Sequence, residues 1–368
     1  MKRAYISVIN DLATDQRVGR VAKLLSEQGF EVTCLGRRLR NSPDLKNKAF
    51  IHRRYRMLFT GGPLFYACFN LRLVTTLLFA RRPALLISND LDTLPANFMA
   101  SRIRRVPLIY DSHELFTQVP ELIHRKAVQS VWKLIERILV PKLQHTVTVN
   151  YSIATIYRRL YGTRFRVVRN VAEKLDYTPR EINPAAKQMI IYQGSLNVGR
   201  GLELMIDAMH YLQNVSFMVV GTGDIEDELK QRVVQNKLSD RVEFRGRMLP
   251  EDLVALTLKA DLGISLEEDL GLNYRYSLPN KLFDYIQCRV PVLCSALPEM
   301  SRIVDSYGIG IASKERDPEK LAGRIRYMLK ERSGGAWMEA LHRAAHELCW
   351  ENESTIYLEL LNDCGVLK

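Results

Sequence analysis

The sequence lacks paired cysteine motifs and any long uninterrupted apolar run. Its six cysteines, at positions 34, 68, 288, 294, 349 and 364, include no Cys-x-x-Cys pair and no metal-ligand spacing. We therefore expect these cysteines to be small buried hydrophobic residues of a protein in a reducing cytosol, and not to form a disulfide framework. The stretch closest to a membrane span, residues 57–80, is interrupted by two glycines, a proline and Arg72, so it falls short of the roughly 18 apolar residues that a spanning helix needs. Residues 5–9 predict a short strand and not the apolar core of a signal peptide.

Acidic residues are scarce in the first half of the chain. Residues 1–180 contain 31 Lys and Arg but only 13 Asp and Glu, a net charge of +18, whereas the remainder has 22 basic and 28 acidic residues, a net of −6. Such a basic surface favours a polyanion or an anionic membrane leaflet as partner. Because no signature of a nucleic-acid-binding fold accompanies the charge, we expect no nucleic acid partner. Many of the basic residues come in pairs, at 37–38, 53–54, 81–82 and 104–105.

The chain has 368 residues, which is enough for two domains. Short β-rich apolar runs alternate with segments whose apolar residues recur at helical spacing, and this rhythm predicts parallel sheets with crossover helices. The domain boundary is predicted within residues 173–187, where Pro179 and Pro184 stand among charged residues. Strands are predicted at residues 3–9, 30–35, 84–88, 106–110, 146–150 and 165–169, and at 189–193, 215–220, 242–245, 261–265, 290–294 and 308–312.

The most informative segment is residues 277–285, Ser-Leu-Pro-Asn-Lys-Leu-Phe-Asp-Tyr. Pro279 predicts the opening of a helix, whose free N–H groups form a natural seat for phosphate. Lys281 adds a positive charge to this turn, and Asp284, one turn further on, can reach a ribose hydroxyl. The layout fits a diphosphate with a sugar on either side. A capped helix whose Lys281 and Asp284 are merely solvated explains the spacing equally well.

Further motifs follow in order along the chain. One is Ile-Tyr-Gln-Gly-Ser-Leu-Asn-Val-Gly-Arg-Gly-Leu-Glu at residues 191–203, and shorter ones lie at 86–90, 109–113, 147–152, 219–224, 242–246 and 249–253. The ordered set resembles glycosyltransferase family 4, the group 1 transferases with the two-domain GT-B fold.

The resemblance implies an α/β protein with two Rossmann-like parallel-sheet domains facing across a cleft that holds the active site. Residues 1–175 would form an N-terminal acceptor-binding domain, and residues 176–345 a C-terminal nucleotide-sugar-binding domain. Residues 346–368 would form a C-terminal helix that crosses back to pack on the N-terminal domain.

The resemblance also implies which residues bind the donor. Arg200 and Lys281 would neutralise the donor diphosphate as catalytic residues, with Arg200 standing where family members usually have lysine. Ser195 occupies the position of a usual arginine, so one cation is lost. The implied donor-binding residues are Gly194, Ser195, Gly199, Arg245, Gly246, Tyr276, Ser277, Leu278, Pro279, Asn280 and Asp284.

The family signature of two glutamates separated by seven residues is altered in this chain. Asp284 matches the second glutamate, but Tyr276 occupies the first position and cannot replace a carboxylate that contacts the donor sugar. Residues 267–269, Glu-Glu-Asp, either supply the missing contact or form a solvated acidic loop.

In the N-terminal domain, His113 matches the family's N-domain histidine and is implied as a third catalytic residue that orients the transferred sugar. A lone histidine is nevertheless more often structural. In the first loop Asp15 and Arg17 replace a common Gly-Gly pair, with Arg17 near phosphate; a plain helix cap by Asp15 is equally consistent. Asp15, Arg17 and Asp92 are assigned to the acceptor side. Asp90 and Asp92 form an Asp-x-Asp pair, but that motif belongs to a different glycosyltransferase fold, so no metal site is predicted.

The resemblance implies a retaining glycosyltransferase of the bacterial polysaccharide type, with a nucleotide diphosphate sugar as co-substrate and no cofactor. Since the basic excess lies in the acceptor-binding half, we expect a lipid-linked saccharide acceptor in polysaccharide, O-antigen or capsule biosynthesis. The enzyme is expected in the cytoplasm, peripheral on an anionic membrane surface through residues 53–82, although residues 64–79 taken alone fit a buried crossover helix. A nucleotide-sugar epimerase and a degenerate, non-catalytic sugar-nucleotide binder remain as alternatives. The Gly-Thr-Gly at 221–223 lacks the third glycine of a dinucleotide fingerprint and is weak evidence for NAD.

Overall fold

The computed structural model describes residues 1–13, 15–39, 42, 45, 50–119, 122, 125–178, 187–333 and 335–367. The chain divides into two compact units, which we call the first and second domains. The first contains Met1–Arg169 and Ser354–Lys368, and the second contains Asn170–Glu353. Of the segment predicted as a domain linker, residues 179–186, including Pro179 and Pro184, lie outside the described residues.

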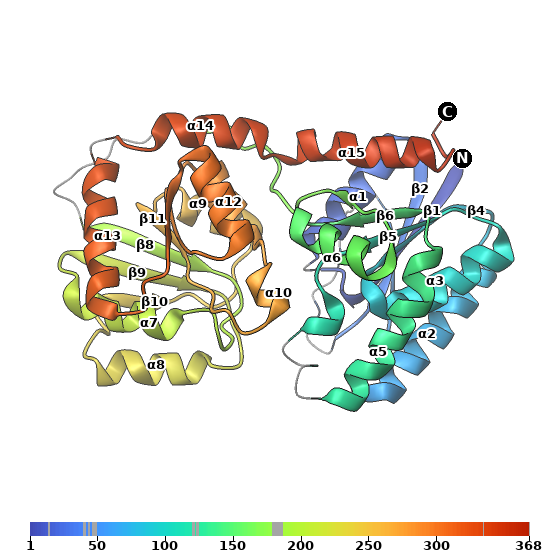
Figure 1. Ribbon diagram of the computed structural model, residues 1–368, viewed down its shortest axis with the longest axis horizontal. Coiled ribbons are helices and arrows are strands. Elements are labelled where there is room, and N and C mark those ends of the chain that lie inside the picture. The colour runs from blue at the N-terminus through green and yellow to red at the C-terminus, as the bar shows by residue number, and fades with distance from the viewer. Residues whose placement is uncertain are drawn as a thin grey trace. The chain divides into compact units, whose positions relative to one another are not determined.

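A seven-stranded parallel sheet forms the centre of the first domain (Figure 1). Its strands are β1 (Lys2–Asp11), β2 (Phe30–Arg37), β3 (Ile51–Tyr55), β4 (Pro83–Asn89), β5 (Leu108–Ser112), β6 (His145–Thr148) and β7 (Arg166–Val167). They are ordered β3-β2-β1-β4-β5-β6-β7, so the winding direction reverses between β1 and β4. Open parallel sheets bind ligands outside the carboxyl ends of the strands near such a reversal.

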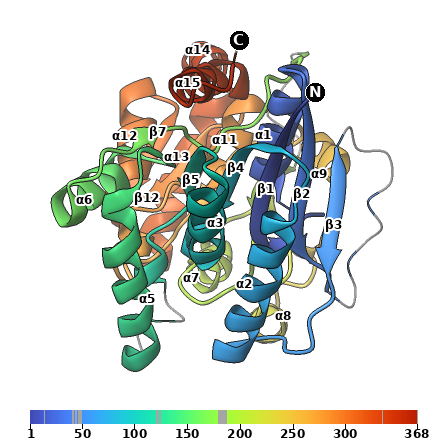
Figure 2. The same ribbon diagram turned by 90° about the vertical axis from the view of Figure 1, so that its right-hand side faces the viewer.

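Helices cover this sheet. They are α1 (Gln16–Glu27), α2 (Gly62–Leu78), α3 (Asp90–Arg104), α5 (Lys126–Leu139) and α6 (Tyr151–Tyr161), with 3-10 turns η1 (Phe116–Gln118) and η2 (Val140–Lys142). Figure 2 shows α2, α3 and α5 side by side on one face of the sheet. The connection through α1 winds in the opposite direction along the sheet, and right-handed crossovers therefore put α1 on the other face.

The second domain has six parallel strands in the order β10-β9-β8-β11-β12-β13. These are β8 (Gln188–Gln193), β9 (Val215–Val220), β10 (Val242–Phe244), β11 (Leu262–Ser265), β12 (Val292–Ser295) and β13 (Gly310–Ser313). The helices are α7 (Leu202–Ala208), η3 (Met209–Tyr211), α8 (Glu226–Gln235), α9 (Pro250–Thr257), α10 (Leu272–Arg275), α11 (Asn280–Gln287), α12 (Pro298–Tyr307), α13 (Pro318–Ser333) and α14 (Met338–Glu347). Helix α7 packs on α8 and α13, whereas α11 packs on α9 and α14.

The predicted α/β architecture of two parallel sheets is confirmed. All twelve predicted strands are present, each within two residues of its predicted bounds, because strands covered on both faces are continuous apolar runs that are easily recognised. The edge strand β3, Ile-His-Arg-Arg-Tyr, was not predicted; an edge strand can remain polar and basic. Pro279 precedes helix α11 as its N-cap, with an extended ψ of 144°, and does not open the helix as predicted.

The last helix, α15 (Trp350–Asp363), belongs to the first domain from Ser354 onward. Arg166 of β7 forms ion pairs with Glu359 and Asp363 of this helix. The predicted return segment began at residue 346, but residues 346–353 group with the second domain. The physical reason is the packing of α14 on α11, where the Gln287 side chain donates to the carbonyl of Leu348 (3.1 Å).

The cysteines differ from the expectation at two positions. All six are free thiols; four are buried as expected, but Cys68 is exposed and Cys364 is partly exposed. Cys68 lies on α2, whose buried face is formed instead by Phe65, Phe69 and Leu73. None of the helices in the described part of the chain combines the length and the apolarity that crossing a bilayer requires.

Burial of Tyr357 predicts that α15 is essential to the first domain. The side chain is 0% exposed, so Tyr357→Ala should lower the free energy of unfolding by about 3–4 kcal/mol through lost apolar contacts and a cavity. Its hydroxyl has no hydrogen-bond partner among the described residues, and Tyr357→Phe should therefore change stability by less than about 1 kcal/mol. Urea unfolding measures both, with the half-exposed Tyr327→Ala of α13 as control. An equal loss in Tyr327→Ala and Tyr357→Ala would contradict the assignment.

Candidate active site

Loops at the carboxyl edge of the second sheet are joined by backbone hydrogen bonds. Gly194, after β8, donates to the carbonyl of Val220 (3.0 Å), and Gly221, after β9, donates to Gly246 (2.8 Å), which follows β10. Three loops thus form one surface at the edge where parallel α/β sheets bind their ligands.

The loop between β8 and α7 approaches the segment after β11 very closely at Gly201. This residue has a φ of +71°, and a Cβ atom there would lie 2.2 Å from the carbonyl oxygen of Leu266. Only glycine fits such a position. In the same contact, the Glu268 N–H donates to the carbonyl of Gly199 (2.9 Å). The close approach holds Arg200 against the loop that follows β11.

At this contact a buried carboxylate meets two cations. Glu267 is 0% exposed, and its Oε1 lies 2.7 Å from Lys281 Nζ and 3.8 Å from an Nη atom of Arg200. The Ser265 hydroxyl donates to the other carboxylate oxygen (2.7 Å). Burial alone would raise the pKa of Glu267, but Lys281 and Arg200 outweigh it and hold the pKa below its usual value. Of the two alternatives for residues 267–269, the solvated loop is therefore wrong for Glu267.

The two cations differ in accessibility. Lys281 is buried, with its ammonium 4.0 Å from the ring centre of Tyr192. The Arg200 side chain is 26% exposed and stacks over the ring of Tyr274. Its Nε is buried without a hydrogen-bond partner among the described residues. Arg200 is thus the more accessible of the two cations, a distinction that the sequence could not show.

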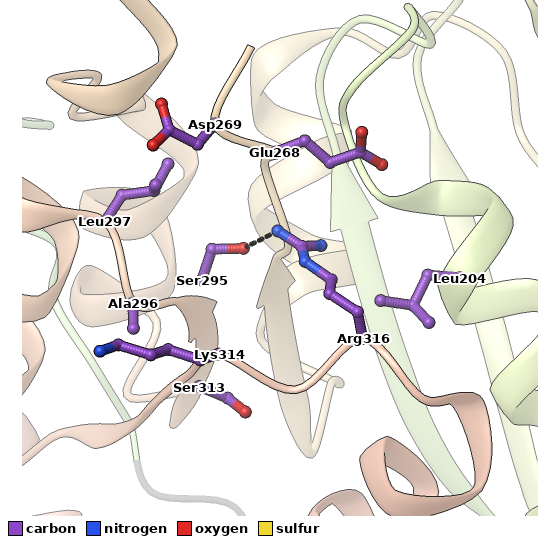
Figure 3. Close-up of a pocket in the computed structure, with 9 residues that line it drawn as sticks. All are labelled: Leu204, Glu268, Asp269, Ser295, Ala296, Leu297, Ser313, Lys314 and Arg316. Atoms are coloured by element: carbon purple, nitrogen blue, oxygen red, sulfur yellow. Dashed lines mark hydrogen bonds between the residues drawn. The ribbon is translucent and has the colours of Figure 1, made fainter. Parts of the chain in front are cut away.

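Arg316, which the sequence analysis missed, fixes the loop that carries Glu267. Its guanidinium donates to the carbonyls of Leu266 (2.9 Å) and Glu267 (2.7 Å) and to the Ser295 hydroxyl (2.9 Å). The residue lines a pocket of about 440 Å³ at the carboxyl ends of β11, β12 and β13, where Figure 3 shows its bond to Ser295. The sequence did contain one signal for Arg316: the residue follows the predicted strand β13 and so lies at the same sheet edge.

Other predicted donor residues lie around this cluster. Asp284 accepts a hydrogen bond from the Gln193 side chain (2.7 Å) and is partly exposed. The Ser277 hydroxyl is buried without a partner among the described residues, a polar atom that a ligand could satisfy. Arg245 is half exposed and pairs with Glu243 at 2.8 Å. Gly194, Ser195 and Asn280 are exposed, Gly246, Tyr276 and Pro279 are partly exposed, and Gly199 and Leu278 are buried.

A second charged cluster lies at the carboxyl ends of β4 and β5 in the first domain. The backbone N–H of His113 donates to Asp90 Oδ1 (2.8 Å). The imidazole of His113 lies 3.4 Å from the other Asp90 oxygen and 3.7 Å from Asp111. Burial alone would lower the pKa of His113, but Asp90 and Asp111 raise it to about 9. The imidazole is therefore protonated at neutral pH. Asp90 adopts a φ of +58°, a left-handed conformation that is costly outside glycine and typical of functional sites.

Arg17 belongs to this cluster and not to an open phosphate site. Its guanidinium is buried and donates to both carboxylate oxygens of Asp111 (2.8 and 3.0 Å) and to the Val168 carbonyl (2.9 Å). The resemblance implies that Arg17 lies near phosphate. In the structure its guanidinium instead donates to Asp111 and Val168 of its own domain. Asp15 caps helix α1 by accepting from the Val18 N–H (3.0 Å), as one of its two readings predicted.

Asp92 is buried in α3, and its Oδ1 has no hydrogen-bond partner among the described residues. Burial, with Asp90 and Glu114 nearby, raises the pKa of Asp92 well above its usual value. Within the described ranges, no three His, Cys, Asp or Glu side chains gather closely enough to hold a metal ion.

The two clusters offer complementary chemistry. The second domain presents a partly exposed arginine, glycine-rich loops and the start of α11, which suit a diphosphate. The first domain presents an imidazolium between carboxylates, which suits sugar hydroxyls. Two parallel-sheet domains with these features define the class of GT-B glycosyltransferases.

Comparisons with known proteins agree with this class. Residues 176–346 match the family model of glycosyl transferases group 1, and residues 15–172 match that of glycosyltransferase family 4. The chain belongs to these glycosyltransferases. A chitobiosyldiphosphodolichol beta-mannosyltransferase of Candida albicans is 24% identical over 251 residues, covering 60% of this chain and 54% of the relative. The chain spans between 36% and 62% of the length of the first curated relatives that it matches.

Solved structures share the fold. A sucrose-phosphate synthase from Thermosynechococcus elongatus superposes with a TM-score of 0.78 at 16% identity, covering 100% of both chains. Anabaena HepE, solved with UDP and glucose, superposes with a TM-score of 0.73 at 16% identity, covering 99% of this chain and 100% of that one. The predicted GT-B fold is confirmed.

The raised pKa of His113 predicts a pH-dependent contribution to stability. A histidine with a folded pKa of about 9 and an ordinary value of 6.5 stabilises the fold fully below pH 6.5 and loses that contribution as pH rises through 9. In the His113→Gln variant, the glutamine side chain cannot be protonated in this pH range. The wild type should therefore exceed this variant by about 2–3 kcal/mol at pH 6, with the difference vanishing near pH 10. Denaturant unfolding at several pH values measures it; a difference that stays constant from pH 6 to 10 would show that Asp90 and Asp111 do not hold an imidazolium.

Proposed function

We propose that this protein transfers a sugar from a nucleotide diphosphate sugar to a hydroxyl acceptor. The observation that carries the proposal is the placement of the partly exposed Arg200 beside the buried Glu267–Lys281 pair at the carboxyl edge of the second sheet. Arginine binds phosphate oxygens with two parallel hydrogen bonds. Support comes from HepE, which has the same fold and was solved in complex with UDP and glucose.

The remaining donor groups are assigned around that diphosphate. The N–H groups at the start of α11, from Asn280, would bind phosphate oxygens together with Arg200. Asp284, held by Gln193, would accept from the ribose hydroxyls. The backbone near Arg245 and Gly246 would contact the base, and the buried Ser277 hydroxyl would bind the donor sugar or a phosphate oxygen.

On the acceptor side, His113 would act as a hydrogen-bond donor in its protonated form. Its imidazolium is oriented by Asp90 and Asp111, and Arg17 holds Asp111 in place. Arg17 is therefore proposed as a positioning residue and not as a phosphate ligand. Asp92, whose Oδ1 has no hydrogen-bond partner among the described residues, is assigned to the acceptor side.

The proposed reaction retains the anomeric configuration. The bond from the anomeric carbon to the diphosphate breaks, the acceptor oxygen bonds to the same face of that carbon, and the acceptor proton passes to the departing phosphate oxygen. The protein supplies no nucleophile and no resident cofactor in this scheme. Arg200, Lys281 and the α11 amides stabilise the negative charge that develops on the leaving group, which is the usual main contribution of such preorganised groups.

A lipid-linked saccharide is proposed as the acceptor, with an anionic membrane surface as partner. The Candida albicans relative is a chitobiosyldiphosphodolichol mannosyltransferase by name, and the basic excess lies in residues 1–180. The first domain also has an apolar surface of a suitable kind. Helix α5 exposes an apolar stripe, with Val131 at 57%, Leu134 at 56% and Ile138 at 47% exposure.

The charges around this stripe favour an anionic bilayer. The acidic residue of α5, Glu136, is buried, whereas Lys126, Lys133 and Arg137 are exposed. The neighbouring helices add exposed apolar side chains, namely Leu64 and Leu71 of α2 and Met99 and Ile103 of α3. We therefore extend the proposed membrane surface from residues 53–82 to the exposed side chains of α3 and α5. Helix α2 buries Phe65, Phe69 and Leu73 but exposes Leu64 and Leu71.

A donor panel tests the function. The pure protein is incubated with UDP-, GDP- and dTDP-sugars, and slow hydrolysis to the nucleoside diphosphate is measured. Hydrolysis of one donor, with the sugar released in the donor's anomeric configuration, is expected. Binding of a sugar nucleotide without hydrolysis or transfer would instead favour a non-catalytic family member, and conversion to an epimeric sugar would favour an epimerase.

Removing either cation should weaken donor use. Arg200→Ala and Lys281→Ala each should lower kcat/KM by about 30- to 1000-fold, corresponding to about 2–4 kcal/mol of transition-state stabilisation. Lys281→Ala also leaves Glu267 buried without its nearest counter-ion, so this variant alone should lose thermal stability. Arg326→Ala, an exposed arginine of α13, is the matched control. Turnover within twofold of wild type in both variants would remove the diphosphate assignment.

Liposome flotation tests the membrane surface. Binding should require anionic lipid and weaken with salt, because each basic residue contributes about 1 kcal/mol near such a surface. Replacing Val131, Leu134 and Ile138 by serine should reduce recovery at least severalfold. The control Val234→Ser changes a residue of α8 that is 67% exposed and should not reduce recovery. Equal recovery with neutral and anionic vesicles would leave a water-soluble acceptor as the better proposal.

A further inference from the structure

Glu267 is a charged group that the proposed reaction does not use. Its carboxylate is completely buried, yet it lies 2.7 Å from Lys281 and 3.8 Å from Arg200, the two cations assigned to the diphosphate. These two cations therefore share one negative charge of the protein itself. The three side chains together carry a net charge of +1.

The carboxylate is held so that it cannot easily withdraw. Arg316 donates to two successive backbone carbonyls, those of Leu266 and of Glu267 itself. Ser265 holds the side-chain oxygen at 2.7 Å. Gly201 also packs closely on this loop, since a Cβ atom there would lie 2.2 Å from the Leu266 carbonyl oxygen. A diphosphate arriving at Arg200 would thus meet a fixed anion close behind its own binding groups.

Repulsion from this anion depends on the charge of the ligand. A nucleotide diphosphate sugar carries two phosphate charges. After the glycosidic bond breaks, the terminal phosphate of the product is a monoester whose second ionisation has a pKa of about 6, so at pH 7.5 it carries one more negative charge. At short range in a poorly screened site, one extra unit charge is sufficient to change affinity severalfold or more.

We propose that Glu267 is a fixed counter-charge that weakens the hold of this site on the nucleoside diphosphate product more than on the donor, and so promotes product release. This inference rests on the proposed function, because it assigns a role to the same diphosphate site. It makes Glu267 a positioning residue that acts through Arg200 and Lys281. It also gives a reason for a buried acid at a site that must bind an anion.

The test compares product and donor binding in Glu267→Gln and wild type. Titration calorimetry with UDP, GDP and dTDP at pH 7.5 and low salt gives the product Kd, and product inhibition of donor hydrolysis gives the ratio to the donor KM. Glu267→Gln should tighten the nucleoside diphosphate Kd about tenfold and the donor KM by clearly less, with a lower kcat as release slows. Glu299→Gln is the matched control, because Glu299 is a buried carboxylate of the same domain that pairs with Arg302.

A second variant guards against misfolding. Glu267→Asp keeps the charge but withdraws it by one methylene, so product binding should tighten in the same direction by about twofold to threefold. Thermal unfolding checks that each variant is folded. An unchanged or weaker product Kd in the folded variants, or equal tightening of product and donor, overturns the inference and leaves the proposed function intact. Failure of wild type to bind any nucleoside diphosphate overturns both.

Discussion

The buried ion pair between Glu267 and Lys281 is the contact on which the rest of the donor half-site depends. It connects the loop after β11 to the first turn of α11 with a 2.7 Å contact out of solvent. Removing one partner of such a pair leaves an uncompensated buried charge and costs about 3–5 kcal/mol. The pair therefore fixes where the α11 amides and Arg200 present their donors. Glycine at 201 and the guanidinium of Arg316 are the structural supports of this one contact.

The first domain uses the same device with the same signs, a buried carboxylate next to two cationic groups. There a buried carboxylate, Asp111, is held by Arg17 through two hydrogen bonds and faces His113. Burial would raise the pKa of Asp111, but Arg17 and His113 lower it to about 2. In both domains the chargeable group next to the ligand surface is oriented by a partner that is itself buried. The partly exposed side chain, Arg200 in one domain and His113 in the other, can then contact a ligand while its orientation stays fixed.

Much of this architecture could be predicted from the sequence, and the rest could not for a definite reason. Parallel strands are apolar runs, so their positions follow from local pattern. The same pattern predicts the sheet edges at which Arg200 and Lys281 lie in the second domain and His113 lies in the first. Pairing across the fold has no local pattern: Glu267 and Lys281, fourteen residues apart, and Arg17 and Asp111, ninety-four apart, become partners only when the sheet forms. Exposure of the α5 stripe has the same origin, since an amphipathic helix does not reveal which of its faces is covered.

The central claim is that a diphosphate binds at Arg200 in front of the Glu267–Lys281 pair. A crystal structure of the full chain with UDP or GDP tests it most directly. The account predicts diphosphate oxygens within about 3 Å of the Arg200 guanidinium and of the first amides of α11, ribose hydroxyls on Asp284, and Glu267 still paired with Lys281. A nucleotide whose diphosphate lies away from Arg200, or a Glu267 carboxylate displaced from Lys281 on binding, would contradict it.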